Sequence, residues 1–176
     1  SCCMHGPLKR AGGVAALQGV RTPSDVAKAV ADLTDHHLLV GKGAQEFARQ
    51  MGFEIEDDIN TDLSRERYLE WRRRIDPAHY PDPNRQANLE PEAIKKFTRE
   101  SLKVASDLAA EGLSDTEHLY GTINCNGVKR EGDVCGVTTT SGLAWMIPGR
   151  VGDSPIVGAG LYVAIDHGAA GSTGRL

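Results

Sequence analysis

The spacing of apolar residues changes along the chain, and this change limits the possible folds more than any other feature. In the first part, apolar residues recur every three to four positions, which predicts helices over 22–33 and 92–110. Farther on, the spacing falls to two, which predicts strands over 119–125, 134–140 and 158–165. Helices followed by strands favour an α+β fold in which layers of the two kinds pack on each other.

The remaining segments carry more local signals. Four prolines fall within residues 76–91, which predicts a loop or linker, and Asn126-Gly127 predicts the turn of a hairpin. The other predicted elements are a buried strand over 37–40, a helix after the turn Gly41-Lys42-Gly43, a helix over 65–74 capped by Ser64, and a helix C-cap at Gly112.

The composition is that of an ordinary globular protein. With 176 residues, 40% of them hydrophobic, the chain is long enough for one domain with a real core or for two small ones. The net charge of −4 argues against a general affinity for nucleic acid or anionic lipid, and no apolar run approaches the roughly 18 residues that span a bilayer. The four cysteines lack a CxxC pair, and Cys125 and Cys135 are predicted to be two buried free thiols rather than a disulfide.

Arginines are concentrated in the predicted helix 65–74, where two interpretations compete. Five arginines together with Tyr68 and Trp71 form the kind of face that binds nucleic acid. Glu66 and Glu70, however, stand at spacings that pair with these arginines along a helix. A solvated amphipathic helix is therefore the preferred interpretation, and nucleic-acid binding is the alternative.

The two ends of the sequence predict an internal fragment. The chain opens on Ser1-Cys2-Cys3-Met4, without an initiator methionine and without the charged and apolar regions of a signal peptide. It closes on Gly174-Arg175-Leu176, inside a glycine-rich stretch. The compartment is left open between the cytoplasm and a lysosomal or periplasmic type of location.

A charged turn in the second half carries the most specific chemical signal. Residues 148–155 include Arg150 and Asp153, whose charges suit the carboxylate and the ammonium group of a zwitterion. The same two residues are close enough in sequence to form a local salt bridge, and physical reasoning alone slightly favours that interpretation. Threonines are frequent nearby, but threonine is common in strands.

Seven short motifs follow one another along the chain: MHGP at 4–7, AGGVAAL at 11–17, TDHHLLVG at 34–41, GTI at 121–123, GVTTTSG at 136–142, PGRVGDSPI at 148–156 and GAG at 158–160. In this order and spacing they resemble the glycosylasparaginase family, a branch of the N-terminal-nucleophile hydrolases that also includes isoaspartyl peptidases. The resemblance covers nearly the whole chain and is weakest in the proline-rich segment.

The resemblance implies a four-layer αββα sandwich, incomplete in this chain, and a self-processing precursor. Family members cut themselves before a threonine, here at the Gly121–Thr122 bond, so that residues 1–121 belong to a first subunit and residues 122–176 begin a second. The matching nucleophile is Thr122. Its freed α-amino group, with a reference pKa of about 7.7–8.0, would act as the base for its own hydroxyl.

The resemblance also assigns roles to other residues. Thr140 matches a threonine whose hydroxyl contacts the amino group of the nucleophile, and Thr173 and Gly174 match the oxyanion hole. Arg150 and Asp153 match the residues that bind the α-carboxylate and the α-amine of the substrate. No metal or organic cofactor is implied. The implied partners are a small substrate and a second αβ unit in a homodimer, rather than nucleic acid or a membrane.

The expected substrate follows from the stretch 141–145. It is of the glycosylasparaginase type, whereas isoaspartyl peptidases more often have glycine in place of Leu143. The expected activity is therefore hydrolysis of the side-chain amide of N4-(β-N-acetylglucosaminyl)-L-asparagine, with release of aspartate. The alternatives are isoaspartyl peptidase or asparaginase activity, and a non-catalytic domain with the family fold. The chain departs from the family at Gly121, where some members have Asp, and at Leu176, where Gly is common.

Overall fold

The computed structural model describes residues 1–74, 91–112, 121–146 and 148–174. The chain divides into two compact units, one made of Ser1–Ile59 with Gly121–Leu176 and the other of Asn60–Tyr120. We call them the sheet unit and the helical unit and describe each by itself. The predicted proline-rich loop, except for Pro91, lies outside the described residues.

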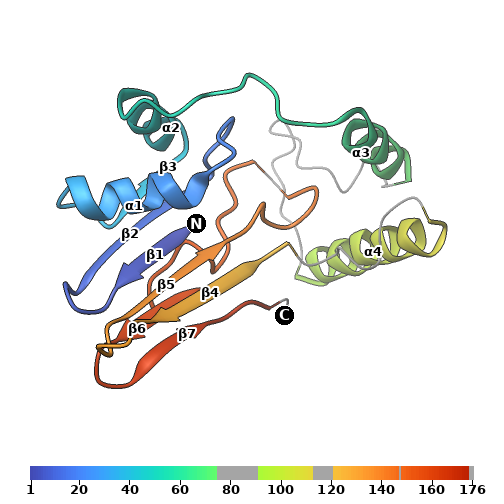
Figure 1. Ribbon diagram of the computed structural model, residues 1–176. Helices are drawn as coiled ribbons and strands as arrows, with labels where there is room; N and C mark the ends of the chain where they lie inside the picture. The colour runs from blue at the N-terminus through green and yellow to red at the C-terminus, as the bar shows by residue number, and fades with distance from the viewer. Residues whose placement is uncertain (75–90, 113–120, 147, 175–176) are drawn as a thin grey trace. The chain divides into compact units, whose positions relative to one another are not determined.

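A mixed sheet forms the centre of the sheet unit (Figure 1). Its described strands are β1 (Cys2–His5), β2 (Arg10–Ala15), β3 (Leu38–Val40), β4 (Ile123–Val128) and β5 (Val134–Thr139), in the spatial order β3-β2-β1-β5-β4. The β2–β3 pair is parallel and the other described pairs of this sheet are antiparallel. Because β1 pairs with β5, segments from both sides of the predicted cleavage bond share one sheet.

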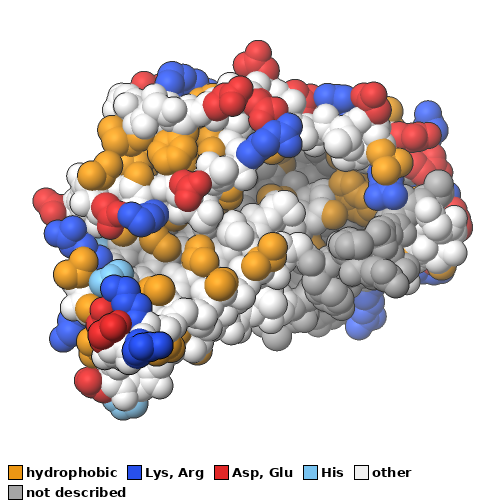
Figure 2. Space-filling model, in the orientation of Figure 1, with side chains coloured by type: hydrophobic (Ala, Val, Ile, Leu, Met, Phe, Trp, Pro, Cys, Tyr) orange, Lys and Arg blue, Asp and Glu red, His pale blue; other side chains and the backbone are white. Residues whose placement is uncertain are grey.

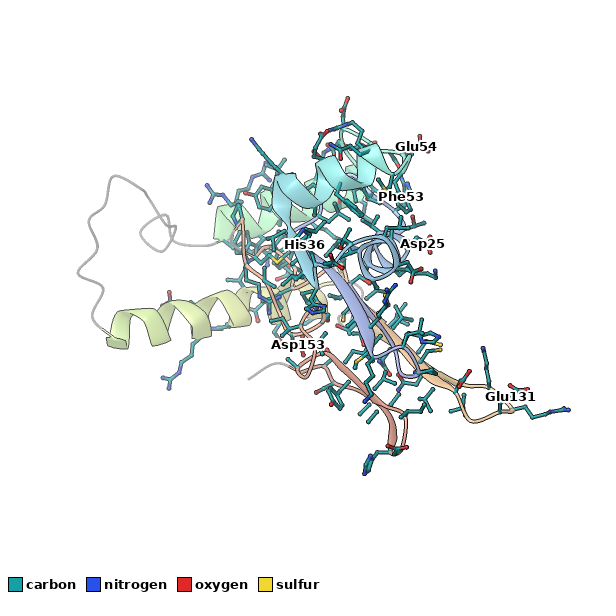
Figure 3. All side chains as sticks on the ribbon, turned by 90° about the vertical axis from the view of Figure 1, so that its left-hand side faces the viewer. Asp25, His36, Phe53, Glu54, Glu131 and Asp153 are labelled. Atoms are coloured by element: carbon teal, nitrogen blue, oxygen red, sulfur yellow. The ribbon has the colours of Figure 1, made fainter. Side chains whose placement is uncertain are left out.

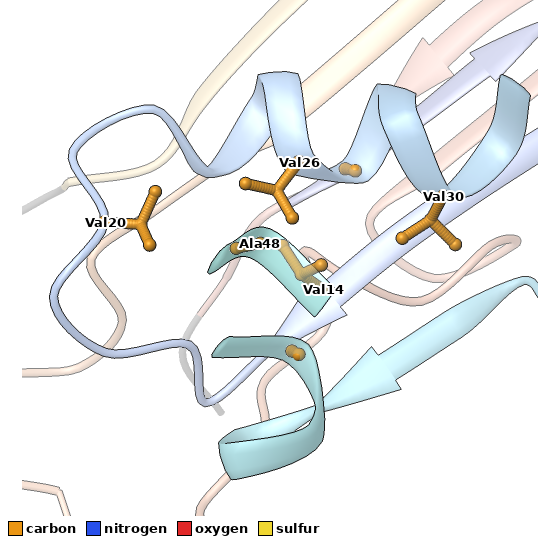
Figure 4. Close-up of a cluster of buried hydrophobic side chains, with 7 residues drawn as sticks. Val14, Val20, Val26, Val30 and Ala48 are labelled. Atoms are coloured by element: carbon orange, nitrogen blue, oxygen red, sulfur yellow. The ribbon is translucent and has the colours of Figure 1, made fainter. Parts of the chain in front are cut away.

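Two helices, α1 (Pro23–Leu33) and α2 (Gly41–Gln50), pack on one face of this sheet. Val26 and Val30, four residues apart on α1, are buried in the same apolar cluster as other helix and strand residues (Figure 4). The helix approaches β2 so closely that a β-carbon placed on Gly12 would lie 2.5 Å from the backbone nitrogen of Ala31. Glycine at position 12 therefore allows α1 to lie directly on the strand.

A second sheet, formed by β6 (Leu161–Ala164) and β7 (Gly168–Gly171), packs on the opposite face. Leu161 and Cys2 are fully buried in an apolar cluster between the two sheets. A β-carbon on Gly136 would lie 2.8 Å from Leu161 Cδ1, so glycine makes room for β6. The described part of the sheet unit thus has the layer order helix, sheet, sheet. The fourth layer of the expected sandwich stays a prediction.

The helical unit contains α3 (Asp62–Arg74) and α4 (Pro91–Ala110). Arg74, at the end of α3, donates to both carboxylate oxygens of Glu111 at 2.8 and 2.7 Å, which joins the two helices. Gly112 follows with a positive φ of 72°, as expected for the end of a helix. None of the described helices is long and apolar enough to cross a membrane.

The ion pairs of α3 favour the solvated-helix interpretation of its arginines. Arg65 pairs with Asp62 at 2.8 Å, and Arg74 pairs with Glu70 at 2.9 Å in addition to its contact with Glu111. Such exposed pairs add little stability, but they neutralise charge that a phosphate backbone would otherwise attract. On the face shown in Figure 2, acidic and basic side chains are likewise interspersed.

Several predicted elements are confirmed, and three local predictions are wrong. The strand predicted to be buried over 37–40 forms β3 at the edge of the sheet, where Leu38 and Val40 are exposed. Asn126-Gly127 lies inside β4, and the hairpin is closed instead by a hydrogen bond from Lys129 N to Asp133 O at 2.9 Å. The helix predicted to start after Ser64 begins two residues before it, because Thr61 Oγ1 accepts from Ser64 N at 3.1 Å and so caps the helix. No strand was predicted at β1, β2 or β7, because β1 and β7 have only four residues each and β2 and β7 each contain two glycines, which weakens a strand pattern.

Candidate functional site

The predicted nucleophile, Thr122, lies at the start of β4 beside the end of β5. Ile123, the first residue of β4, pairs with Thr139, the last residue of β5. Thr122 directly precedes Ile123 and Thr140 directly follows Thr139, so both lie at this end of the strand pair. A β-carbon placed on Gly121 would lie 3.1 Å from Ser141 Oγ and 4.0 Å from Thr140 Oγ1. The structure therefore brings two hydroxyl groups to the predicted cleavage bond.

The hydroxyl group of Thr140 is held by the backbone that follows it. Thr140 Oγ1 accepts a hydrogen bond from Gly142 N at 3.0 Å, and Gly142 has a positive φ of 88°. A side chain would be strained in this conformation, so glycine allows the chain to turn sharply here. The acceptor role leaves the proton of Thr140 available for donation to a second group.

A line of polar side chains continues from this point along β4 and β5. Asn126 Nδ2 donates to Asn124 Oδ1 at 2.9 Å, and Asn124 Nδ2 donates to Thr138 Oγ1 at 2.7 Å. The buried Thr138 hydroxyl in turn donates to the carbonyl oxygen of Gly160 at 3.0 Å. We call this set the polar line. No role was predicted for these residues from the sequence, although the spacing of two from Thr122 places the asparagines on the same strand face.

Strand β7 runs along β4 towards the predicted nucleophile. Asn126 Nδ2 lies 3.5 Å from the carbonyl oxygen of Ala169, and two residues further on Gly171 lies directly against the side chain of Asn124. The two contacts are two residues apart on each strand and in opposite order, so β4 and β7 run antiparallel to each other. Thr173 follows two residues after Gly171, beyond the end of β7.

The charged turn between β5 and β6 presents Arg150 and Asp153, the latter labelled in Figure 3. Arg150 is exposed, and its guanidinium folds back over Gly152. Among the described residues, neither Arg150 nor Asp153 takes part in an ion pair. The local salt bridge considered from the sequence is therefore not formed, and both charges are available to a ligand.

Close packing holds this turn against the sheet. Pro155 is buried, and its carbonyl oxygen would lie 2.8 Å from a β-carbon on Gly13. A β-carbon on Gly160 would lie 2.5 Å from the carbonyl oxygen of Asp153. Gly160 also accepts the hydrogen bond from Thr138, so it connects the charged turn to the polar line.

The cysteines do not form the predicted pair of buried thiols. Cys125 and Cys135 are both free and exposed, and Cys125 pairs with Val137 in the sheet. The buried thiol is that of Cys2, and burial raises its pKa from 9.0 to about 11. Within the described part of the chain, no group of three or more His, Cys, Asp or Glu side chains is arranged to hold a metal ion.

Comparison with known proteins points to one family. A sequence model of the asparaginase family, Asparaginase_2, matches residues 1–175. The chain is similar to the N(4)-(β-N-acetylglucosaminyl)-L-asparaginases of Mus musculus and Rattus norvegicus, each 34% identical over 97% of this chain and 48% of the relative. It is also similar to the protein of that name from Elizabethkingia miricola, 32% identical over 93% of this chain and 38% of the relative. The chain spans about half the length of the mammalian relatives.

Proposed function

This chain belongs to the asparaginase family of N-terminal-nucleophile hydrolases, and we propose that the protein containing it is a self-processing amidohydrolase. The proposed substrate is N4-(β-N-acetylglucosaminyl)-L-asparagine, whose side-chain amide is cleaved with release of aspartate. The proposal rests on the position of Thr122, which directly precedes β4 at the end of the strand pair where Thr140 directly follows β5. The complete protein is proposed to have the four-layer αββα sandwich of N-terminal-nucleophile hydrolases.

Self-cleavage is proposed to occur at the Gly121–Thr122 bond. Thr122 Oγ attacks the carbonyl carbon of Gly121, the C–N bond breaks as an ester forms, and the nitrogen takes up a proton to become a free α-amino group. Water then hydrolyses the ester and leaves a carboxylate on Gly121. The two pieces would stay together, because β1 before the cut is hydrogen-bonded to β5 after it.

Substrate hydrolysis would use the same hydroxyl group. The free α-amino group of Thr122, with a reference pKa of about 7.7–8.0, is partly neutral near pH 7 and takes the proton from Oγ. Thr122 Oγ attacks the side-chain carbonyl carbon of the substrate, and the departing nitrogen receives that proton. Water then hydrolyses the aspartyl ester. Thr140 Oγ1 has a second lone pair besides the one that accepts from Gly142 N, and it would accept a hydrogen bond from the amino group and so orient it, which leaves the lone pair of the nitrogen free to act as the base.

Arg150 and Asp153 would select the aspartyl part of the substrate. A guanidinium binds a carboxylate through two parallel hydrogen bonds, and a carboxylate binds an ammonium group. The lack of an ion pair at either residue, within the described range, supports this role because no described side chain competes with the ligand. Thr173 and Gly174 are proposed to supply donors to the oxyanion, which the course of β7 along β4 supports.

Two alternatives concern the substrate and the activity. Isoaspartyl peptides and asparagine contain the same aspartyl group, so Arg150 and Asp153 would bind them equally well. Leu143 favours the glycosylated substrate, since isoaspartyl peptidases resembling this chain more often have glycine there. The other alternative is a non-catalytic domain with the family fold. A homodimer of processed αβ units is the assembly we propose.

Intact mass spectrometry of the purified protein, with sequencing of any new N-terminus, tests the proposal. We expect two pieces, one of which begins Thr122-Ile123-Asn124, and a single uncut chain in the Thr122→Ala variant. Thr139→Ala is the matched control, because Thr139 is also a threonine at this end of the strand pair but lies on the face of β5 opposite to that of Thr140. Processed protein should hydrolyse the glycosylated asparagine. Activity in Thr122→Ala would exclude this nucleophile, and turnover of isoaspartyl dipeptides alone would reverse the order of substrates.

A further inference from the structure

The buried hydroxyl of Thr138 joins three elements of the sheet unit. Its side chain is fully buried. Thr138 Oγ1 accepts from Asn124 Nδ2 on β4 at 2.7 Å and donates to the carbonyl oxygen of Gly160, just before β6, at 3.0 Å. Valine has nearly the same shape and suits a strand equally well. A buried hydroxyl costs free energy unless it is hydrogen-bonded, so threonine has no advantage over valine in packing here. What the hydroxyl adds is the fixed direction of these two hydrogen bonds.

The carbonyl oxygen of Gly160 accepts a second hydrogen bond, from Ser172 N at 3.1 Å. Ser172 lies beyond the end of β7 and directly precedes Thr173 and Gly174, the predicted oxyanion residues. One carbonyl group therefore connects the Thr138 hydroxyl to the backbone of this segment.

The polar line has a single direction. Asn126 donates to Asn124, Asn124 donates to Thr138, and Thr138 donates to Gly160. Each bond in such a chain polarises the next, so the chain is stronger than its separate bonds. An aspartate at position 124 would break this order, because a carboxylate has no proton to donate to Thr138 Oγ1.

We propose that Thr138, oriented by Asn124, is a positioning residue that holds the segment from Ser172 to Gly174 beside Thr122. The inference rests on the proposed function for the roles of Thr122 and Thr173. Donors of an oxyanion hole must point to the place where negative charge develops, so a small displacement of this segment reduces the stabilisation of the transition state. Thr138 itself does not touch the reacting atoms.

Amide hydrogen exchange at Ser172 provides a test that does not depend on activity. In Thr138→Val, the Gly160 carbonyl loses one partner and its orientation, and we expect Ser172 N–H to exchange about five- to tenfold faster, as for the loss of one hydrogen bond. Thr138→Ser keeps the hydroxyl and should restore slow exchange. Thr139→Val is the matched control, because it changes the adjacent residue on the other strand face.

A second variant covers the case in which Thr138→Val does not fold. Asn124→Ala removes the donor to Thr138 at an exposed position and should also speed amide exchange at Ser172. Asn124→Asp should have the same effect on exchange with almost no change in side-chain size. Exchange at Ser172 equal to that of the unmodified protein in folded Thr138→Val, or in Asn124→Ala where the valine variant does not fold, would overturn the proposal.

Steady-state kinetics then separate positioning from general loosening. In Thr138→Val we expect kcat to fall about tenfold with little change in KM, because the lost interaction acts mainly in the transition state. Thr138→Ser should recover most of kcat. A rise in KM with unchanged kcat would contradict the proposal. If Thr122→Ala stays active, the proposed function fails. If Thr122→Ala is inactive but Ser172 exchange and kcat are unaffected in Thr138→Val, only the positioning role fails.

Discussion

The two faces of the five-stranded sheet are held by different kinds of interaction. On the helix face, Val26 and Val30 of α1 belong to an apolar cluster with no directional bonds among its members. On the face that carries β6 and β7, the apolar cluster around Leu161 is smaller, and Thr138 forms hydrogen bonds to neighbouring elements beside it. Apolar packing stabilises without specifying direction, whereas a hydrogen bond restricts both distance and angle.

This difference indicates where the protein sets the positions of its reacting groups. The helix face accounts for much of the buried apolar surface of the sheet unit, while the polar line lies on the other face and ends at Gly160, against which Asp153 packs. Substitutions on the helix face should therefore change stability first. Substitutions on the other face should change local order and catalysis first.

The largest effect on stability is expected at Gly12, where α1 leaves no room for a side chain. Gly12→Val would place a β-carbon 2.5 Å from Ala31 N, so the helix must move away from β2. We expect the free energy of unfolding, measured by urea denaturation, to fall by about 3 kcal/mol. Gly43→Ala is the control, because no heavy atom lies within 4 Å of a β-carbon on that residue of α2. It should be neutral or stabilise by about 0.5 kcal/mol. Equal stability of the Gly12 variant would contradict the described packing.

A smaller loss is expected when the helix-face core is thinned without a clash. Val30 is fully buried, and Val30→Ala should lower the free energy of unfolding by about 2 kcal/mol through lost burial and an incompletely filled cavity. Val128→Ala, at a side chain that is 70% exposed, should change it by less than about 0.5 kcal/mol. Val30→Ala should leave the exchange of Ser172 unchanged relative to neighbouring amides. Selective exchange at Ser172 in this variant would remove the distinction between the two faces.

The smallest effect on the protein at neutral pH is expected from alkylation of its thiols, among which Cys2 reports burial between the two sheets. Cys125 and Cys135 are exposed and should react readily with iodoacetamide, whereas Cys2 should react only after unfolding. Peptide mapping after a timed reaction with the folded protein measures the order. Early alkylation of Cys2 would show that the cluster around Leu161 opens easily.

The same thiol predicts a dependence of stability on alkaline pH. Burial raises the pKa of Cys2 from 9.0 to about 11, so the folded state disfavours the thiolate. Its contribution to stability is complete below pH 9 and is lost as the pH rises from 9 towards 11. The difference in unfolding free energy between the unmodified protein and Cys2→Ala should therefore be constant up to pH 9 and shrink above it. A constant difference to pH 11 would show that the thiol is not desolvated.

The helices and the main chemical residues were predicted from the sequence because their signals are local. Residues 22–33 and 92–110 show helical spacing, and the structure has α1 and α4 there within a residue or two at each end. Order and spacing of short motifs likewise identified the family, which the comparisons confirm, and placed Thr122 and Arg150 in it. The roles of those residues remain predictions.

The pairing of strands and the surroundings of the side chains were decided by the tertiary structure. The pairing of β1 with β5, which lies about 130 residues farther along the chain, was not predicted, because no local pattern shows which distant segments will pair. The absence of an ion pair at Arg150 within the described residues, and the two hydrogen bonds of Thr138, depend on the fold in the same way. Helical order comes from hydrogen bonds four residues apart, so nearby residues encode it. A sheet and a site are built from contacts between distant segments, whose distances and directions exist only once the chain has folded.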